Sequence, residues 1–194
     1  MKKLDNRGFT LVELLICIII FGVVLVAVFG FMMASAKSFN TVNDRLDLQL
    51  QAQLTSNQLS EYLVDCTGGI CTSADGKTVY ILNRESSGGA DYTVHIFKQV
   101  ENRINYGRQA ATYNAATQKY TFTDLADSEL SAFLQADGVQ LLLKDAQGNT
   151  VTQPGSPVAS VELSLRFEKR SAKYSVTKNI ALRNLPPLIT VEPV

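Results

Sequence analysis

The longest uninterrupted apolar stretch of this 194-residue chain lies close to its first residues. Residues 14–36 are 23 consecutive uncharged positions, with Ile, Val, Leu and Phe distributed on every face of a helix. About 20 helical residues span the hydrocarbon core of a bilayer, so the segment is long enough to cross one. A surface helix of a soluble domain would not be apolar all round. The pattern therefore predicts a membrane-spanning helix.

After Lys37 the pattern becomes amphipathic, with one apolar stripe and polar residues on the other faces. The residues of this stripe recur mostly every three or four positions, as is typical of a helix. They are Phe39, Val42, Leu46, Leu50, Leu54, Leu59, Tyr62 and Leu63. No proline occurs before Pro154. We therefore expect one helix over residues 10–65, roughly 80 Å long at about 1.5 Å per residue. Its second half would bury the stripe as ordinary core packing.

Beyond Gly68 and Gly69 the alternation has the two-residue period of strands. Residues 79–84 and 92–97 predict a hairpin around a turn at residues 86–89. A second hairpin is predicted from residues 161–168 and 174–182, with a polar turn at 169–173 and one buried face. Shorter strands are predicted at 120–122 and 139–144, a short helix within 124–136, and a surface loop at 107–118.

The fold class expected is α+β, with a long N-terminal helix packed on an antiparallel sheet. The predicted divisions are a leader at residues 1–8, an apolar helix at 9–36, its amphipathic continuation at 37–65, a β-rich head at 66–185, and an exposed C-terminal tail at 186–194.

Charge gives no sign of a nucleic-acid or acidic partner, because Lys plus Arg and Asp plus Glu both total 18. The leader carries Lys2, Lys3 and Arg7 against Asp5, and the rest of the chain then holds 15 basic and 17 acidic residues, a net charge of −2. The positive excess is local. It would orient the apolar segment with its N-terminal side in the cytoplasm.

The junction between the leader and the apolar segment carries the most specific motif. It reads Gly8-Phe9-Thr10-Leu11-Val12-Glu13. This arrangement resembles the processing site of type IV pilins and type II secretion pseudopilins. The resemblance covers residues 1–35, and beyond them it is one of architecture only. It implies a type IV pilin-like fold, cleavage between Gly8 and Phe9 by a prepilin peptidase, and N-methylation of Phe9.

Glu13 is the one charge in the apolar segment, and a charge near the membrane costs a few kcal/mol. Cleavage after Gly8 would give Phe9 a free α-amine four residues away. An acid and an ammonium that are both buried among apolar helices relieve each other's desolvation by pairing. In the family that the segment resembles, the matching glutamate attracts the N-terminus of a neighbouring subunit. Glu13 is therefore expected to set the register between subunits.

The resemblance also implies the partners and the location. We expect a prepilin peptidase and methyltransferase, other pilin or pseudopilin subunits, and an inner-membrane assembly platform with a cytoplasmic ATPase. Membrane lipid would surround the helix before assembly, with the head outside the cytoplasm, and the final location would be an extracellular or periplasmic filament. Chain size and the absence of a C-terminal disulfide loop favour a minor pilin or pseudopilin of the W or J kind.

Other interpretations stay open. Ala34-Ser35-Ala36 is similar to a signal-peptidase site, although the apolar run exceeds the roughly 7–15 residues of a signal peptide. A plain membrane anchor leaves Glu13 unexplained. Gly22 and Gly30 serve either as soft points of the helix or as close-packing positions. Rival functions are a competence pseudopilin for DNA uptake and an anchored or secreted adhesion domain unrelated to filaments.

Cysteine and histidine add little catalytic chemistry. Cys17 lies in the apolar segment, where a thiol behaves as a small hydrophobe. Cys66 and Cys71 enclose four residues, and either a disulfide outside the cytoplasm or two free thiols fit that spacing. His95, the only histidine, lies in a predicted strand, and the acidic pair Asp124 and Asp127 resembles a solvated helix start. No phosphate loop, metal-ligand cluster or nucleophile with a base is recognisable, so no enzyme activity, metal or cofactor is expected.

Overall fold

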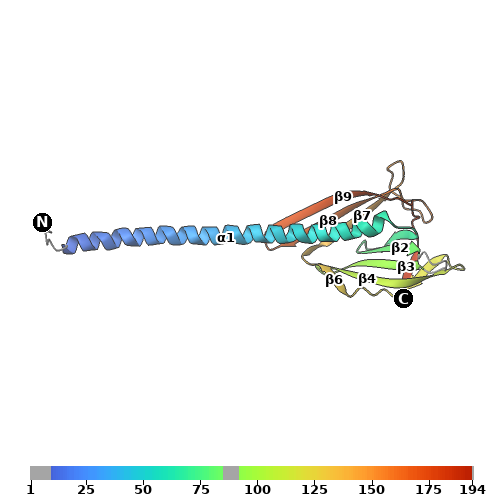
Figure 1. The fold of residues 1–194 in the computed structure, drawn as a ribbon, viewed down its shortest axis with the longest axis horizontal. Helices are drawn as coiled ribbons and strands as arrows, with labels where there is room; N and C mark the ends of the chain where they lie inside the picture. Colours follow the sequence, from blue (N-terminus) through green and yellow to red (C-terminus); the bar gives the residue numbers. More distant parts are fainter. Residues whose placement is uncertain (1–9, 85–91, 194) are drawn as a thin grey trace, which may run out of the picture. The chain divides into compact units, whose positions relative to one another are not determined.

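A computed structural model describes residues 10–84 and 92–193, and Figure 1 shows its elements. Within these ranges one helix, α1 (Leu11–Val64), precedes a head of ten strands. Two compact units divide the chain between Asn43 and Asp44. The predicted α+β architecture, a long N-terminal helix followed by an antiparallel-rich head, is confirmed. The turn predicted at 86–89 and the junction of Gly8 and Phe9 lie outside the described residues.

The head contains two sheets, not the single sheet that the strand pattern suggested. The larger sheet has the order β1 (Gly69–Thr72), β2 (Thr78–Arg84), β3 (Tyr92–Val100), β4 (Arg103–Asn114), β5 (Lys119–Phe122) and β10 (Val191–Pro193), with β6 (Ser128–Ser131) paired to β4. The smaller sheet has the order β7 (Leu134–Lys144), β8 (Ser160–Lys169) and β9 (Ala172–Ala181). Neighbouring strands are antiparallel except β10, which runs parallel to β5.

The helix from Asp44 onwards lies between the two sheets, as Figure 1 shows. One apolar cluster joins Leu48, Leu59 and Leu63 of α1 to residues of both sheets, among them Ile81 and Phe167, and all five side chains are fully buried. Small residues on the same face of the helix are also buried: Ala52, Thr55, Ser56 and Ser60. Small side chains allow the sheets to approach the helix closely, which fixes the side of α1 that the head covers.

The larger sheet is buried on both faces. Residues of β2 alternate between the helix-side cluster, which holds Val79 and Ile81, and a second cluster that holds Tyr80 and Leu82. The second cluster is covered in part by Ile189 and Val191 from the C-terminal segment. The prediction of an exposed C-terminal tail is therefore wrong: Pro186 is buried, and β10 pairs with β5.

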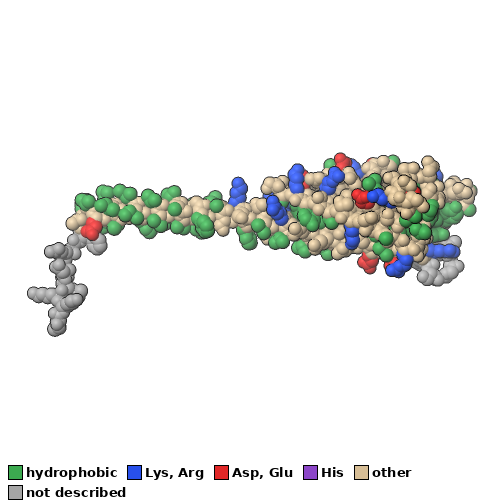
Figure 2. Space-filling model, turned by 90° about the horizontal axis from the view of Figure 1, so that it is seen from above, with side chains coloured by type: hydrophobic (Ala, Val, Ile, Leu, Met, Phe, Trp, Pro, Cys, Tyr) green, Lys and Arg blue, Asp and Glu red, His purple; other side chains and the backbone are tan. Residues whose placement is uncertain are grey.

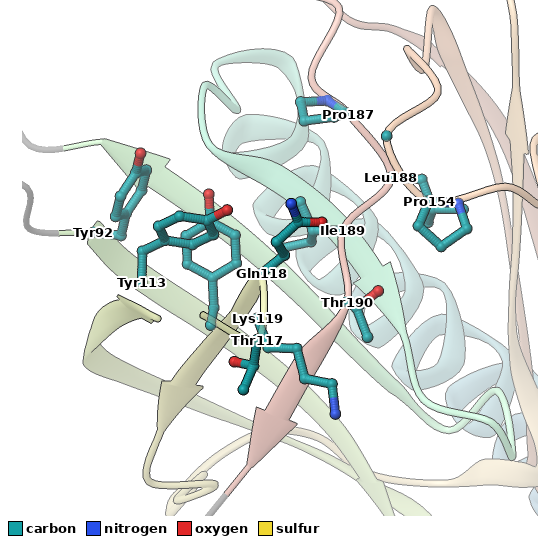
Figure 3. Close-up of a pocket in the computed structure, with 12 residues that line it drawn as sticks. Tyr92, Tyr113, Thr117, Gln118, Lys119, Pro154, Pro187, Leu188, Ile189 and Thr190 are labelled. Carbon is teal, nitrogen blue, oxygen red and sulfur yellow. The ribbon is translucent and has the colours of Figure 1, made fainter. Parts of the chain in front are cut away.

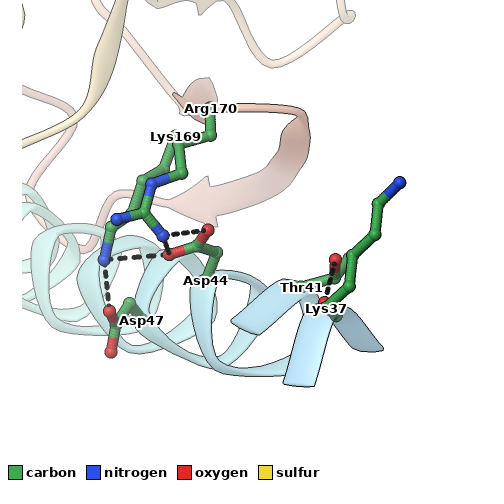
Figure 4. A network of polar contacts seen from close by, with 6 residues as sticks. All are labelled: Lys37, Thr41, Asp44, Asp47, Lys169 and Arg170. Carbon is green, nitrogen blue, oxygen red and sulfur yellow. Dashed lines mark hydrogen bonds and ion pairs between the residues drawn. The ribbon is translucent and has the colours of Figure 1, made fainter. Parts of the chain in front are cut away.

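An ion-pair network attaches the turn between β8 and β9 to the helix (Figure 4). The Nζ of Lys169 lies 3.2 Å from Oδ1 of Asp44 and 2.5 Å from Oδ2 of Asp47, and Nη1 of Arg170 lies 3.1 Å from Oδ2 of Asp44. Only 7% of Asp44 is exposed. Hydrogen bonding to Asp47 raises the pKa of Lys169, so the ammonium stays charged. Buried Asp44 thus has two cationic partners, as a buried carboxylate requires.

Both predicted hairpins are confirmed. Asn83 of β2 faces Thr93 of β3, and Lys169 faces Ala172 at the end of the β8–β9 pair. The strand predicted at 120–122 is β5, and the strand at 139–144 is the second half of β7. Hydrophobic alternation with period two therefore identified both hairpins, although β2 is buried on both faces.

Two predictions in the middle of the head are wrong. The loop expected at 107–118 is largely strand β4, which continues through Gly107. A Cβ at Gly107 would collide with the backbone carbonyl of Leu125, so glycine here marks the close approach of another segment and not a loop. The helix expected within 124–136 is instead an extended stretch, strand β6 and the start of β7. Asp124, read as a helix start, pairs with Lys98 at 2.6 Å.

Candidate functional site

The first part of α1 is a continuous apolar surface that none of the described residues covers. Every residue from 10 to 40 is exposed, and every large hydrophobic side chain from Leu11 to Met33 has at least half of its surface accessible. Apolar side chains cover this segment in Figure 2. Burying one large apolar side chain contributes about 1.5–3 kcal/mol, and exposed patches of this extent mark interaction or membrane surfaces. The segment therefore requires apolar surroundings, lipid or protein, beyond this one chain.

Thr10 caps the start of the helix. Its Oγ1 accepts a hydrogen bond from the backbone N–H of Glu13 at 3.2 Å, and its carbonyl accepts one from the N–H of Leu14, also at 3.2 Å. Thr10 and Glu13 have the spacing of a capping box, in which the first side chain bonds the backbone three residues on. The sequence following the leader thus defines where the helix begins.

Glu13 lies in the first turn of α1 and is exposed. A carboxylate there is favoured by the partial positive charge of the helix N-terminus, an effect of about 0.3–1 kcal/mol. No ion pair joins Glu13 to another group among the residues that the structure describes. Gly8 and Phe9, the predicted cleavage and methylation residues, lie outside the described ranges, so their roles stay predictions.

The helix runs without a break through Gly22 and Gly30. A Cβ at either glycine would have no neighbour within 4 Å apart from the helix itself and adjacent residues. Neither glycine is thus required by packing within the described chain. Cys17 is exposed on the same segment.

α1 alone in the described chain is long and apolar enough to cross a membrane, and none of its apolar part is buried. A core helix of a soluble protein can be as long and as apolar, but its apolar part would be buried. The combination of an apolar span and full exposure therefore agrees with membrane anchoring.

The prediction that the apolar stripe packs in the core is wrong for most of its members, because the head covers a different face of the helix. Leu46, Leu50 and Leu54 are 50%, 58% and 61% exposed, and Phe39 and Val42 are also exposed. Only the later members, Leu59 and Leu63 above all, are buried. The sheets cover the neighbouring face instead, which carries Leu48, Ala52, Thr55, Ser56 and Ser60. The run of small side chains at three- and four-residue spacing was the signal in the sequence that could have identified this face.

Cys66 and Cys71 are separate free thiols in the structure. The Sγ of Cys66 lies 3.3 Å from the carbonyl oxygens of Gly69 and of Leu82, in the helix-side cluster. Cys71 packs against the second cluster, on the other face of the larger sheet. Cys66 precedes β1 and Cys71 lies within it, and the two thiols pack in different clusters without a bond between them. A disulfide between them outside the cytoplasm stays a prediction. Burial raises the pKa of Cys66 to about 11, so this thiol is unreactive.

His95 belongs to the packing between α1 and the larger sheet. Its ring stacks on Tyr62 of α1 with centroids 4.0 Å apart, and its Nδ1 lies 2.8 Å from the hydroxyl of Tyr106. The Tyr106 hydroxyl in turn donates to that of Tyr62 at 3.2 Å. Burial, with a smaller contribution from Arg108, lowers the pKa of His95 to about 4. The neutral imidazole therefore acts as a packing group at physiological pH.

No group of three or more His, Cys, Asp or Glu side chains in the described ranges is arranged to hold a metal ion. The site consists of an exposed apolar helix with an acid, Glu13, in its first turn.

Comparison with known proteins gives one match. Residues 3–29 match the family described as the prokaryotic N-terminal methylation motif. No curated protein and no solved structure matches the chain. This motif is the signature of type IV pilins and pseudopilins, whose roles are structural, and the long helix followed by an antiparallel-rich head fits a type IV pilin-like fold. The motif implies processing by a prepilin peptidase and assembly with other pilin subunits.

Proposed function

We propose that this protein is a structural subunit, a minor pilin or pseudopilin, of a type IV pilus or a type II secretion pseudopilus. A prepilin peptidase cuts after Gly8, and the new N-terminus at Phe9 is methylated. Residues 9–36 hold the precursor in the membrane and then form the core of the filament. Residues 37–65 connect this core to the head at residues 66–185.

One observation carries the proposal. The most apolar segment of the chain is also its most exposed, with every large side chain from Leu11 to Met33 at least half accessible. Lipid satisfies this surface in the precursor. In a filament, neighbouring helices replace lipid, and because lipid tails are as apolar as leucine, close packing and specific polar contacts must favour association.

Glu13 supplies such a polar contact. Within a bundle of apolar helices an unpaired carboxylate costs several kcal/mol, and pairing with the α-amine of a neighbouring Phe9 relieves both charges. Because the amine and Glu13 are four residues apart in the chain, a contact between different subunits also fixes the axial offset of one subunit from the next. Methylation of the amine retains its positive charge.

The exposed stripe of Leu46, Leu50 and Leu54 supports a second contact between subunits. Its three leucines are four residues apart on one face of α1, and the head of the same chain leaves them uncovered. We infer that a neighbouring subunit covers them after assembly, so that the contact extends along the helix past residue 36.

The charges of the leader support the orientation. Lys2, Lys3 and Arg7 favour a cytoplasmic N-terminus, which places the head outside the cytoplasm. The cytoplasmic ATPase and the membrane platform of such systems would then extract the helix from the bilayer into the growing filament.

The mature N-terminus tests the proposal. Mass spectrometry of the protein from membranes, with and without a prepilin peptidase, should find methylated Phe9 as the first residue only when the peptidase is present. A chain that begins at Lys37 would instead identify a secreted domain, and an intact Met1 in the presence of the peptidase would identify a plain anchor. Either result would contradict the proposal.

A substitution of Glu13 distinguishes processing from assembly. Glu13→Gln should be cleaved normally and inserted in the membrane, yet its recovery in sheared filaments should fall strongly because the partner of the Phe9 amine is lost. Glu61→Gln is the matched control, since Glu61 is an exposed acid on the same helix. Equal recovery of both variants in filaments would remove the role given to Glu13.

A further inference from the structure

A pocket lined by tyrosines lies at one end of the larger sheet, and the assembly function does not use it. Figure 3 shows this pocket between the ends of β3, β4 and β5 on one side and two proline-containing segments, around Pro154 and Pro187, on the other. Its volume is about 490 Å³, within the range of small-molecule sites. Residues 107–118 gave no candidate in the sequence because they were read as a loop.

Three aromatic rings form one wall. Tyr120 is 9% exposed and has its ring centroid 5.0 Å from that of Tyr92 and 5.0 Å from that of Tyr113. Burial raises the pKa of Tyr120 to about 12, with a further contribution from a hydrogen bond to Tyr92, so its hydroxyl stays neutral. Tyr113 is 42% exposed. The wall thus has a fixed base, Tyr120, and an accessible ring, Tyr113.

Backbone hydrogen bonds join the segments that line the pocket. The N–H of Tyr120 donates to the carbonyl of Thr190 at 3.3 Å, and the N–H of Gly155 donates to the carbonyl of Leu188 at 2.7 Å. Gln118 has a left-handed backbone, with φ of 55°, in the turn that enters β5. The walls are therefore positioned before any ligand arrives, which lowers the entropic cost of binding.

The polar groups of the pocket indicate the class of ligand. Hydroxyls of Thr117 and Thr190 and the amide of Gln118 both donate and accept hydrogen bonds. Among the described residues that line the pocket there is no carboxylate, and their one cation, Lys119, lies 3.6 Å from Glu192. A strongly acidic ligand would have to compete with Glu192 for Lys119, and a strongly basic ligand would be repelled by the same ammonium. A purely apolar ligand would leave the hydroxyls and the amide without partners.

We propose that this tyrosine pocket binds a neutral hexose unit of a polysaccharide. The apolar C–H face of a sugar ring stacks on the exposed ring of Tyr113, and its hydroxyls, which donate and accept, bond to Gln118 and the two threonines. The inference is independent of the proposed assembly function, since it concerns only the head. In a filament subunit it would give the head a contact with a polysaccharide surface.

The test uses the full chain in a detergent without a sugar headgroup, because glycoside detergents would compete for the pocket. Cellohexaose, maltohexaose, mannohexaose and chitohexaose are titrated in turn, with saturation-transfer NMR and calorimetry as readouts. The chain contains no Trp, so tyrosine emission provides a third signal. At least one of the four should bind with a Kd of about 1 mM or tighter.

Variants locate the binding. Tyr113→Ala should weaken it about tenfold or more, in line with the loss of one stacking contact on an aromatic side chain. Tyr113→Phe keeps the ring and should bind within about threefold of the original chain. Gln118→Ala should weaken binding, and Gln147→Ala, at an exposed turn outside the pocket, should not. Urea midpoints equal to that of the original chain would establish that the variants fold.

Three results would overturn the proposal. The first is no binding of any of the four oligosaccharides at about 10 mM. The second is binding that Tyr113→Ala leaves unchanged. The third is binding of a decathymidylate that depends on Tyr113 while the sugars do not bind, because this would assign the tyrosines to stacking on nucleic-acid bases.

Discussion

The two ends of α1 both carry apolar side chains, but the rest of the described chain covers them at one end only. From Leu11 to Met33 every large apolar side chain is at least half exposed, whereas Leu48, Leu59 and Leu63 are fully buried by the two sheets. The exposed end is the more apolar of the two. Hydrophobicity thus shows that a segment requires apolar surroundings but does not show whether they come from the same chain, from lipid or from another subunit.

Two faces of the helix next to the head also differ in exposure. Leu48 and Leu50 are two residues apart, and they are 0% and 58% exposed. One leucine stabilises the fold of the single chain. The other is left uncovered by the head, and the proposed function assigns it to a contact with a neighbouring subunit.

The largest expected effect comes from charging the exposed end. Ile20→Arg combined with Val24→Arg should release the chain from membranes, since each arginine at the centre of a spanning helix costs about 2.5–3.5 kcal/mol. Resistance to alkaline carbonate extraction measures the membrane-bound fraction. The control combines Ile20→Leu with Val24→Leu and should stay bound. Equal extraction of both proteins would mean that lipid is not the partner of this segment.

The leucine pair gives the next largest effect. Leu48→Ala should lower the free energy of unfolding by about 2–5 kcal/mol, because it leaves a cavity between helix and sheets. Leu50→Ala should change it by less than about 0.5 kcal/mol, as expected for an exposed site. Urea unfolding in detergent measures both. Recovery in filaments should show the opposite order: among the molecules that fold, Leu50→Ala should be recovered less well than Leu48→Ala. Similar losses of unfolding free energy for both variants would show that the head covers both faces of the helix.

Acid should weaken the contact between the buried end of α1 and the larger sheet. The pKa of His95 is about 4 in the folded protein and about 6.5 when unfolded. A depressed histidine pKa means that the unfolded state binds the extra proton, so stability is full above pH 6.5 and falls as the pH drops towards 4. Allowing for partial solvent screening, the loss is about 2 kcal/mol.

Unfolding in urea at pH 7 and at pH 4.5 measures this loss. His95→Gln removes the titrating group and should flatten the dependence between those values, whatever its own stability. An unchanged slope in that variant would assign the pH dependence to other groups, and not to the ring that stacks on Tyr62.

Local patterns predicted those elements whose period matched a single buried face. Strand β8 is of this kind, because Val161, Leu163, Leu165 and Phe167 are buried and the residues between them are more exposed. Prediction failed where a distant segment determines the conformation: Gly107 lies within a strand because Leu125 passes close to it, and residues 124–136 are extended because β6 pairs with β4. Nothing within either segment specifies these contacts.

The sequence alone determined the long helix, its apolar first part, the acid at Glu13 and the motif at the leader junction. These features are local, since each depends on the identity and spacing of neighbouring residues. Tertiary structure decided which face of the helix the head covers, on which sheet faces Cys66 and Cys71 lie, and that the C-terminal segment joins β5. It also brought Tyr92, Tyr113 and Tyr120 together. These outcomes depend on packing between residues far apart in the chain, where small side chains and sheet register, not hydrophobicity alone, select the contact.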